Sequence, residues 1–484
     1  MAASFFFYDL ETSGIDPRSA RIMQFAGQRT DMDLKPIGEP VNQLIALSPD
    51  VLPDPDAILL TGITPQQTLA EGLSETEFTS LFYKEVVKPD TIFVGFNSIR
   101  FDDEFMRFLN YRNFYDAYEW QWRNGCSRWD ILDVVRMTRA LRPDGIKWPY
   151  AADGKPTNRL QLLSSINKLD HAHAHDALSD VQATIAVARL IQANQPDLFN
   201  FLLKARTKKA VAALVNADQP FVYTSGRYSS DYLHTTAVIR LSDHPQNDAA
   251  LVYDLRVDPK PYLSMSIDEL LEAWRFTRDP GALRLPVKTL KYNRCPAVAP
   301  LGVIKDGDAQ ERLKLPLTHV KKHLALLRQN QAKLAKNVLM ALERLERERE
   351  ASQVGLVDNP LTVDERLYDG FIGDKDKSLM QAVRTADPSE LSTLAGELND
   401  LRLQNLLPLY KARNYPKALT DEERVAWDSF CYLKLFSGGD SSRASMFFNR
   451  LQEQSAASPD KRQEYLLEEL RLYGESILPG DVTG

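Results

Sequence analysis

Apolar runs near the start of the chain predict two buried strands. Residues 4–11 are aromatic and strand-forming, and the Thr-Ser-Gly sequence at 12–14 is typical of a turn. Residues 91–96 form a second apolar run, and apolar positions recur at helical spacing over 101–109. Because strands alternate with helices up to residue 192, this part of the chain is predicted to be an α/β domain.

The pattern changes after residue 196. Strand-like runs separated by turn residues are found at 221–223, 235–241 and 250–253. A long helix is predicted over 318–350, and from about residue 364 the pattern is helical. Because 484 residues are too many for one hydrophobic core, we predict three domains. Their expected boundaries are 1–192, 196–350 and 357–484.

Charge is unevenly spread along the chain, which has 59 Lys and Arg against 66 Asp and Glu. The net charge is −7 for residues 1–190, +7 for 191–350 and −7 for 351–484. A basic middle segment in an acidic protein is typical of a surface that binds a polyanion. For one set of basic residues a solvated helix face is an equally good explanation: Lys321, Lys322, Lys333 and Lys336.

Cysteine content and hydropathy indicate the compartment. Cys126, Cys295 and Cys431 are far apart and odd in number, which favours a reducing environment over a disulfide framework. The first residues lack the basic region of a signal peptide, and no apolar run approaches the ~20 residues of a membrane span. We expect a soluble, cytoplasmic protein with no membrane association, and a monomer as the default.

Two acidic residues lie on the first predicted strand. Asp9 and Glu11 are two positions apart, so their side chains point to the same face. Two carboxylates side by side on a buried strand repel each other unless a cation offsets their charge, which favours a hard metal ion. On its own this pair is weak evidence for a metal site, because two acidic residues are also expected where the end of a strand reaches solvent.

Three further residues could complete a site. Asp102 is expected at the start of a helix, where an acid is favoured by the helix dipole whatever its function, and spacing alone does not separate it from Asp103 and Glu104. Asp180 is expected in the first turn of a later helix, with His175 in the loop before it. That placement suits a general base that moves over a water held by a fixed carboxylate. The alternative is a low-complexity loop, because three histidines fall within residues 171–175.

Together, four carboxylates and one histidine predict a site that holds two Mg²⁺ ions and activates water for phosphodiester hydrolysis. In order and context they resemble the DEDDh 3′–5′ exonuclease superfamily. The resemblance implies a ribonuclease-H-like fold, metal ligation by Asp9, Glu11, Asp102 and Asp180, and His175 as the catalytic base. Asp102 is expected to act largely through water, and Mn²⁺ is expected to substitute for Mg²⁺.

Longer motifs narrow the resemblance to the bacterial exodeoxyribonuclease I family. They are Gly95-Phe96-Asn97, Arg100-Phe101-Asp102-Asp103-Glu104, Ser127-Arg128-Trp129-Asp130, Ala140-Leu141-Arg142-Pro143-Asp144-Gly145, Leu367-Tyr368-Asp369-Gly370-Phe371 and Lys411-Ala412-Arg413-Asn414-Tyr415-Pro416. The family implies an α/β exonuclease domain, an SH3-like β-barrel domain with helices and an α-helical C-terminal domain. Its implied activity is processive 3′–5′ degradation of single-stranded DNA to 5′-mononucleotides, in DNA repair and recombination.

The same resemblance assigns binding residues. Glu11 is expected to contact the terminal 3′ hydroxyl and Arg159 to bind the substrate. Aromatic and basic side chains interleave between residues 107 and 136, as in proteins that stack single-stranded bases. The matching DNA-contacting positions are Arg107, Tyr118, Trp122 and Arg136, whereas Trp120 and Trp129 are expected in the core. Family members bind the acidic C-terminal tail of single-stranded DNA-binding protein, and Arg142 is predicted to make one such contact.

Two alternatives stay open. An RNA exonuclease of the same superfamily would share all five catalytic residues. A non-catalytic single-stranded DNA-binding scaffold would be expected to have lost at least one metal ligand, and none of the five is missing here.

Overall fold

The computed structural model describes residues 3–169, 176–245, 248–275, 277–279, 281–305, 307–353 and 359–477. The chain divides into two compact units, and each is described by itself. Unit 1 comprises 1–127, 171–182 and 359–484, and unit 2 comprises 128–170 and 183–358. These units cut across the three predicted domains, whose boundaries stay predictions.

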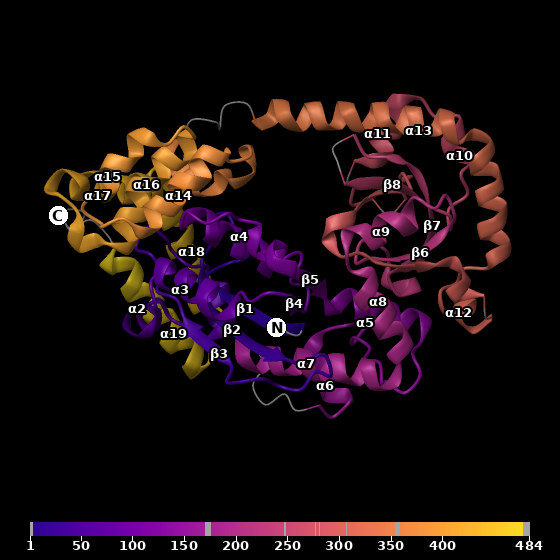
Figure 1. Ribbon diagram of the computed structural model, residues 1–484, viewed down its shortest axis with the longest axis horizontal. Coiled ribbons are helices and arrows are strands. Elements are labelled where there is room, and N and C mark those ends of the chain that lie inside the picture. The colour runs from indigo at the N-terminus through magenta and orange to yellow at the C-terminus, as the bar shows by residue number, and fades with distance from the viewer. Residues whose placement is uncertain are drawn as a thin grey trace. The chain divides into compact units, whose positions relative to one another are not determined.

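A mixed sheet forms the centre of unit 1 (Figure 1). Strand β1 (Ser4–Thr12) pairs antiparallel with β2 (Ile22–Thr30) and parallel with β4 (Thr91–Gly95). Strand β3 (Val41–Leu44) pairs antiparallel with the outer side of β2. The two predicted strands are therefore confirmed, and they lie side by side.

The core beneath β1 determines which face the acidic residues occupy. Phe6, Tyr8 and Leu10 pack into one buried cluster with side chains from β2 and β4. Because strand side chains alternate, Asp9 and Glu11 point to the opposite face. Both are only partly buried, in contrast to the fully buried strand residues around them.

Helices of unit 1 come from both ends of the chain. The first set is α1 (Pro55–Thr61), α2 (Pro65–Glu71), α3 (Glu75–Leu81), α4 (Asp102–Arg112) and the start of α7 (Ala177–Asn194). The π-helix η1 (Phe82–Val86) and the 3₁₀ turns η2 (Glu119–Gln121) and η3 (Arg123–Gly125) lie between them. Trp120, on η2, is buried as predicted.

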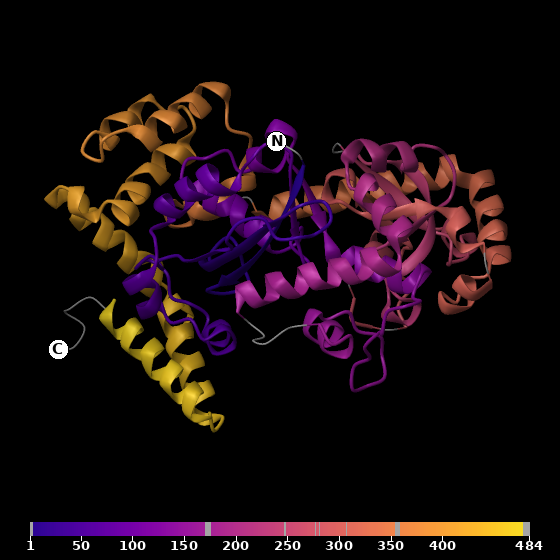
Figure 2. The ribbon, with the colours of Figure 1, turned by 60° about the horizontal axis from the view of Figure 1, so that its bottom comes forward.

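The second set lies after residue 359. It comprises η7 (Pro360–Asp369), α14 (Asp374–Thr385), α15 (Leu391–Leu394), η8 (Ala395–Glu397), α16 (Leu401–Asn414), η9 (Pro416–Ala418), α17 (Asp421–Phe436), η10 (Gly439–Ser441), α18 (Arg443–Ala456) and α19 (Lys461–Ser476). Helices α18 and α19, yellow in Figure 2, pack on α1 and α2. Their apolar residues share one buried cluster with Met23, Ile58 and Ile63.

Buried charges also join the two ends of the chain. Arg21, next to β2, pairs with Asp364 of η7 at 2.8 Å. Arg413 of α16 lies 2.7 Å from both Asp364 and Asp50. Lys434 of α17 contacts the same two carboxylates. Because all five side chains are buried, each depends on its partners to offset the cost of leaving water.

Unit 2 contains the second sheet, with strand order β10-β6-β7-β8-β9 and antiparallel neighbours throughout. The strands are β6 (Phe221–Thr224), β7 (Thr235–Asp243), β8 (Ala249–Asp254), β9 (Val287–Lys291) and β10 (Ala297–Pro300). Three of them correspond to the strands predicted from the sequence, which are confirmed.

The helices of unit 2 include the long one that the sequence predicts. It is α13 (Leu317–Gln353), and the predicted range 318–350 is confirmed. The others are α5 (Ile131–Leu141), α6 (Leu160–Ile166), the rest of α7, α8 (Pro196–Ala205), α9 (Lys208–Val215), α10 (Lys260–Leu263), α11 (Ile267–Trp274) and α12 (Gly307–Arg312). Trp129, on β5 (Ser127–Asp130), is buried as predicted. Within the described ranges, no helix has the length and apolar character needed to cross a bilayer.

Candidate active site

Three of the predicted carboxylates meet at the face of β1. Asp9 and Glu11 come from the strand, and Asp180 comes from the first turn of α7. Their oxygen atoms lie within 4.8 Å of one another, which is close enough for one cation to contact all three. The side chain of Asp176 accepts a hydrogen bond from the backbone N–H of Ser179 at 3.0 Å and so caps the turn that carries Asp180.

Asp102 is the first residue of α4 and is 4% exposed. It lies outside the group of three, but its negative charge acts on both residues of β1. For Asp9, burial raises the pKa most, and the charge of Asp102 is the next cause. The fourth predicted carboxylate therefore lies near enough to both acidic residues of β1 to raise their pKa values.

The structure distinguishes Asp102 from its neighbours Asp103 and Glu104, whereas their spacing in the sequence did not. Asp103 accepts a hydrogen bond from the Tyr8 hydroxyl at 2.5 Å. Glu104 pairs with Arg107 at 2.6 Å and accepts a hydrogen bond from Tyr368. These contacts give Asp103 and Glu104 structural partners away from the carboxylate group.

Electrostatic repulsion within the group is strong. Burial, followed by the charges of Asp102, Glu11, Asp180 and Asp176, raises the pKa of Asp9 well above its ordinary value. Burial, and then the charges of Asp180, Asp102 and Asp176, raises the pKa of Glu11 to about 8. Carboxylates that hold their protons this firmly need an added positive charge to ionise together at neutral pH.

For two further predicted site residues, His175 and Arg159, the structure tests no role. His175, the predicted base, lies outside the described residues. Arg159 precedes the first turn of α6 in unit 2, and its side chain is exposed. The predicted roles of both residues stay predictions.

Two of the predicted DNA-contacting residues of unit 1, Arg107 and Tyr118, are in contact, and the third, Trp122, is exposed. Arg107 is only 4% exposed, donates to Glu104 and Gln121, and lies 5.4 Å from the centre of the Tyr118 ring. Trp122, in contrast, is 62% exposed. Arg107 therefore packs against the partly buried ring of Tyr118, and the exposed indole of Trp122 follows four residues later in the chain.

Two other predicted binding residues of unit 2, Arg136 and Arg142, lie on α5 and directly after it. Arg136 is mostly buried and pairs with Asp133 at 2.7 Å. Arg142, directly after α5, donates to the carbonyl groups of Leu141 and Val303. Both arginines are thus held in fixed positions, and their predicted partners stay predictions.

A polar cavity of about 440 Å³ adjoins the carboxylate group and was not predicted. Its lining includes Gln24, Asn42, Thr61, Gln67 and Asp176. Gln24 lies opposite Glu11 in the β1–β2 ladder, so its side chain shares the face of the acidic pair. Asp176 could have been predicted near the site, because it precedes Asp180 by four residues, which is about one helical turn. Gln24 could not have been predicted there, because its position opposite Glu11 depends on the register of the two strands.

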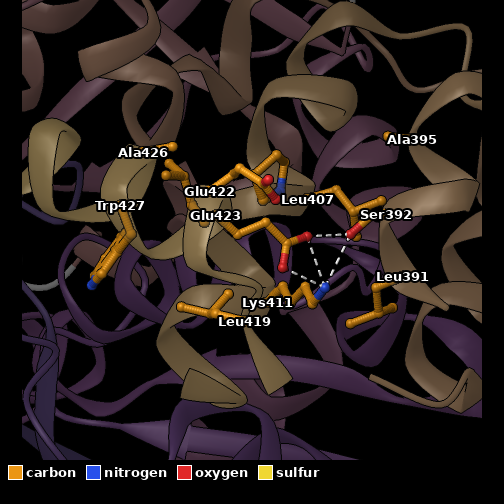
Figure 3. Close-up of a pocket in the computed structure, with 12 residues that line it drawn as sticks. Leu391, Ser392, Ala395, Leu407, Lys411, Leu419, Glu422, Glu423, Ala426 and Trp427 are labelled. Carbon is orange, nitrogen blue, oxygen red and sulfur yellow. Dashed lines mark hydrogen bonds and ion pairs between the residues drawn. The ribbon is translucent and has the colours of Figure 1, made fainter. Parts of the chain in front are cut away.

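A second cavity, of about 380 Å³, lies among α15, α16 and α17, away from the acidic residues of β1 (Figure 3). Its lining is mostly apolar, and its polar side chains include Glu422 and a group in which Lys411 donates to Glu423 and Ser392. Because Lys411 offsets the charge of Glu423, and Glu422 accepts a hydrogen bond from Thr420, these two glutamates do not form a mutually repelling carboxylate group like that of β1.

Family models match three successive parts of the chain. A model described as exonuclease matches residues 6–188, the exonuclease I SH3-like domain matches 206–343, and the exonuclease I C-terminal domain matches 361–477. The predicted succession of an α/β exonuclease domain, an SH3-like domain and a helical domain is confirmed.

Individual relatives match almost from end to end. Exodeoxyribonuclease I of Haemophilus influenzae is 38% identical and the alignment covers 98% of this chain and 99% of the relative. The Escherichia coli protein of the same name is 37% identical, with 98% of both chains covered.

Solved structures agree with these relatives. Exonuclease I from Methylocaldum szegediense superposes with a TM-score of 0.90 at 40% identity and covers 99% of this chain and 100% of its own. The E. coli enzyme in complex with a dA16 oligonucleotide gives 0.91 at 35% identity, with 98% and 100% covered. With its acidic group at the end of β1 and these matches along its length, the chain belongs to the exodeoxyribonuclease I family and is an exonuclease.

Proposed function

We propose that this protein removes 5′-mononucleotides from the 3′ end of single-stranded DNA by hydrolysis at two Mg²⁺ ions, and that it serves DNA repair and recombination. The observation that carries the chemistry is the convergence of Asp9, Glu11 and Asp180 within 4.8 Å, with Asp102 close by. The substrate is supported by family membership and by relatives solved with dA16 and dT13 oligonucleotides.

The donor set fits a hard divalent cation. All four side chains offer carboxylate oxygens, which suit Mg²⁺ or Mn²⁺ better than softer metals. The raised pKa values of Asp9 and Glu11 reflect burial and repulsion from the neighbouring carboxylates, which a bound cation would offset. A zinc-bound complex of the E. coli enzyme with single-stranded DNA has been solved, so a relative binds a divalent metal. When bound, the two ions would activate water and neutralise charge on the phosphate.

The residues of the chain have distinct roles in this proposal. Asp180 and Asp9 fix the site, because each projects from a regular element. Glu11 also contacts the 3′ hydroxyl of the terminal nucleotide, and Asp102 acts largely through water. His175 takes a proton from the attacking water, as a neutral imidazole can near pH 7.

Substrate binding uses a separate set of residues. Trp122 and Tyr118 would stack on bases, since an exposed ring can cover any base. Arg136 and Arg159 would bind the phosphate backbone. For Arg107, the buried ion pair with Glu104 supports a role in holding Tyr118 in addition to any contact with DNA.

We also propose binding to the acidic C-terminal tail of single-stranded DNA-binding protein, with Arg142 as one contact. An SSB/exonuclease I structure exists for a relative. An arginine held between backbone carbonyls keeps its charge and suits an acidic peptide. We further propose that the protein is a monomer and that its three domains span residues 1–192, 196–350 and 357–484.

Digestion of 3′-labelled DNA tests the function. With Mg²⁺, the intact protein should release labelled mononucleotide from single-stranded DNA, and much less from RNA of matched sequence. Asp180→Asn should abolish release, because it removes a ligand without changing size. Asp197→Asn is the matched control, since Asp197 also lies in the first turn of a helix but is exposed on α8. Equal activity of the two variants would refute the site.

A further inference from the structure

The cavity of about 380 Å³ among α15, α16 and α17 lies outside the carboxylate group of β1 (Figure 3). Its volume is in the range of cavities that bind small organic molecules. Leucine, alanine and proline side chains make up most of its lining, and the ring of Trp427 adds an aromatic wall. The walls therefore suit an apolar ligand, and the polar groups among them determine what else that ligand must carry.

The basic residue of the lining is fully engaged within the protein. Lys411 is 3% exposed, and its ammonium group donates to Ser392 at 3.1 Å and to both carboxylate oxygens of Glu423 at 2.8 Å. The hydrogen bonds from Lys411 and then from Ser392 lower the pKa of Glu423 to about 2. Because these contacts use all three donors of the ammonium group, Lys411 offers none to an anionic ligand.

The charge of the second glutamate in the lining is not offset in this way. Glu422 is exposed and accepts a hydrogen bond from the Thr420 hydroxyl at 3.2 Å. Among the residues that the structure describes, no basic side chain forms an ion pair with Glu422. Its carboxylate therefore presents a negative charge at the cavity.

A proline inside α16 adds a second acceptor. Pro408 lies in the lining and has no N–H, so it cannot donate to the carbonyl group of Gln404, four positions earlier. Residues four positions apart share one face of a helix, so this carbonyl lies on the face of Pro408. The indole nitrogen of Trp427 points away from Lys411 and Glu423 (Figure 3). The polar groups that remain for a ligand are therefore acceptors.

We propose that this cavity binds a small apolar cation, whose body packs against Trp427 and whose ammonium group donates to Glu422. The walls bury the apolar surface of the ligand, and the acceptors favour an ammonium group over a carboxylate. A docked protein is a poorer fit, because a stable protein interface covers about 800 Å² on each partner. The site is independent of the proposed nuclease activity, since none of its residues belongs to the carboxylate group of β1.

Three naphthalene compounds with the same ring and different ends test the preference for a cation. They are naphthylethylamine, naphthylethanol and naphthylacetate. Calorimetry and saturation-transfer NMR at neutral pH should show that the amine binds about tenfold more tightly than the acetate, with the alcohol between them. Equal affinity of the amine and the acetate would overturn the proposal, and so would the absence of binding by all three compounds.

Removal of single charges tests the role of Glu422. Glu422→Gln should reduce the preference for the amine over the acetate to about twofold, because it removes the charge and keeps the size of the side chain. Asp428→Asn is the matched control, since Asp428 is exposed on α17 but lies outside the lining. This control should keep the full preference. A preference that survives Glu422→Gln, or that both variants lose equally, would contradict the assigned contact.

Filling the cavity tests where the compounds bind. Ala426→Phe introduces a ring into the lining, whereas Val425→Phe introduces the same ring at the neighbouring position, which is 65% exposed and outside the lining. We expect at least about a tenfold loss of amine affinity in Ala426→Phe and no loss in Val425→Phe. Thermal melting checks folding, and Ala395→Phe, also in the lining, replaces Ala426→Phe if that variant melts early. Unchanged affinity in the filled variant would show that the compounds bind elsewhere and would overturn the proposal.

Discussion

At the scale of single residues, the raised pKa of Glu11 makes metal binding depend on pH. Burial and then the charges of Asp180, Asp102 and Asp176 raise this pKa to about 8. A carboxylate must lose its proton before it binds a cation, so below pH 8 the metal displaces a proton. We expect the Mg²⁺ affinity to fall about tenfold per pH unit from 8 to 6 and to level off above 8.

Calorimetry in buffers of different ionisation enthalpy measures the displaced protons directly. At pH 6.5, metal binding should release at least about one proton per site. Well above pH 8 it should release none. An affinity that does not change with pH, with no release, would contradict the shifted carboxylate. Asp197→Asn should behave like the intact protein.

The same shift predicts how the metal-free protein responds to pH. The folded state binds more protons than the unfolded state between the ordinary pKa of 4.5 and about 8. Stability should therefore fall as pH rises through that window. Asp180→Asn removes one repelling charge, so we expect the metal-free variant to melt a few degrees above the intact protein at pH 8. A lower melting temperature would argue against repulsion within the group.

Trp122 and Arg107 should respond differently to removal of their side chains. Trp122→Ala is expected to weaken single-stranded DNA binding by ~1–3 kcal/mol with no change in stability, because the indole is exposed. Arg107→Ala should reduce the free energy of unfolding by about 3 kcal/mol, since it removes the positive charge that is paired with Glu104. Oligonucleotide titration and urea unfolding separate the effects. Loss of stability in Trp122→Ala would return this residue to a structural role.

At the scale of elements, η7 carries two aspartates that pair with arginines in opposite environments. Asp364 is buried with Arg21, Arg413 and Lys434, whereas Asp369 pairs with Arg366 at the surface. Asp364→Asn should cost about 3–5 kcal/mol of unfolding free energy, and Asp369→Asn less than about 1 kcal/mol. The urea midpoint at constant slope measures both. Similar midpoints would show that the buried network contributes little.

The pH dependence of this network has the opposite sign from that of the active site. Burial alone would raise the pKa of Asp364, but the charges of Arg413, Lys434 and Arg21 together hold it well below the ordinary value of 3.8. Its contribution to stability is therefore present above pH 3.8 and is lost only when pH falls much lower. Between pH 7 and 4 the difference between the intact protein and Asp364→Asn should stay constant.

Elements with strong local patterns could be predicted from the sequence. The aromatic run of β1, the alternating strands β6, β7 and β8, and the long periodic helix α13 all lie where predicted. The carboxylates of β1 were identifiable because alternation fixes their common face. Asp102 could not be told from Asp103 and Glu104, because the distant partners of those two residues, Tyr8 and Tyr368, are brought to them by tertiary structure.

At the scale of the whole molecule, contacts between distant segments were beyond sequence reasoning. Arg21 and Asp364 are 343 positions apart, and Asp50 and Lys434 are 384 apart. No local period signals such pairs. For the same reason the segment 357–484 reads as a separate helical domain in the sequence, while the structure places 359–484 in one unit with the catalytic strand.

That organisation predicts the result of truncation. Phe108, Tyr111 and Phe114 pack in one buried cluster with apolar residues of α16. A chain of residues 1–358 would expose this cluster and would leave Asp50 without Arg413 and Lys434. We expect it to aggregate or to lose its cooperative thermal transition, as measured by size-exclusion chromatography and circular dichroism. A soluble, cooperatively folding fragment would show that the C-terminal helices are dispensable for the fold.

In the proposed mechanism, Asp9, Glu11, Asp102 and Asp180 together hold two divalent metal ions. Electron paramagnetic resonance of the Mn²⁺-loaded protein tests it most directly, because two ions held by shared carboxylates give a spin-coupled spectrum. We expect two bound Mn²⁺ ions with coupled spins, and loss of the coupled signal in Asp180→Asn but not in Asp197→Asn. A spectrum of isolated Mn²⁺ in the intact protein, or a coupled signal that survives Asp180→Asn, would contradict it.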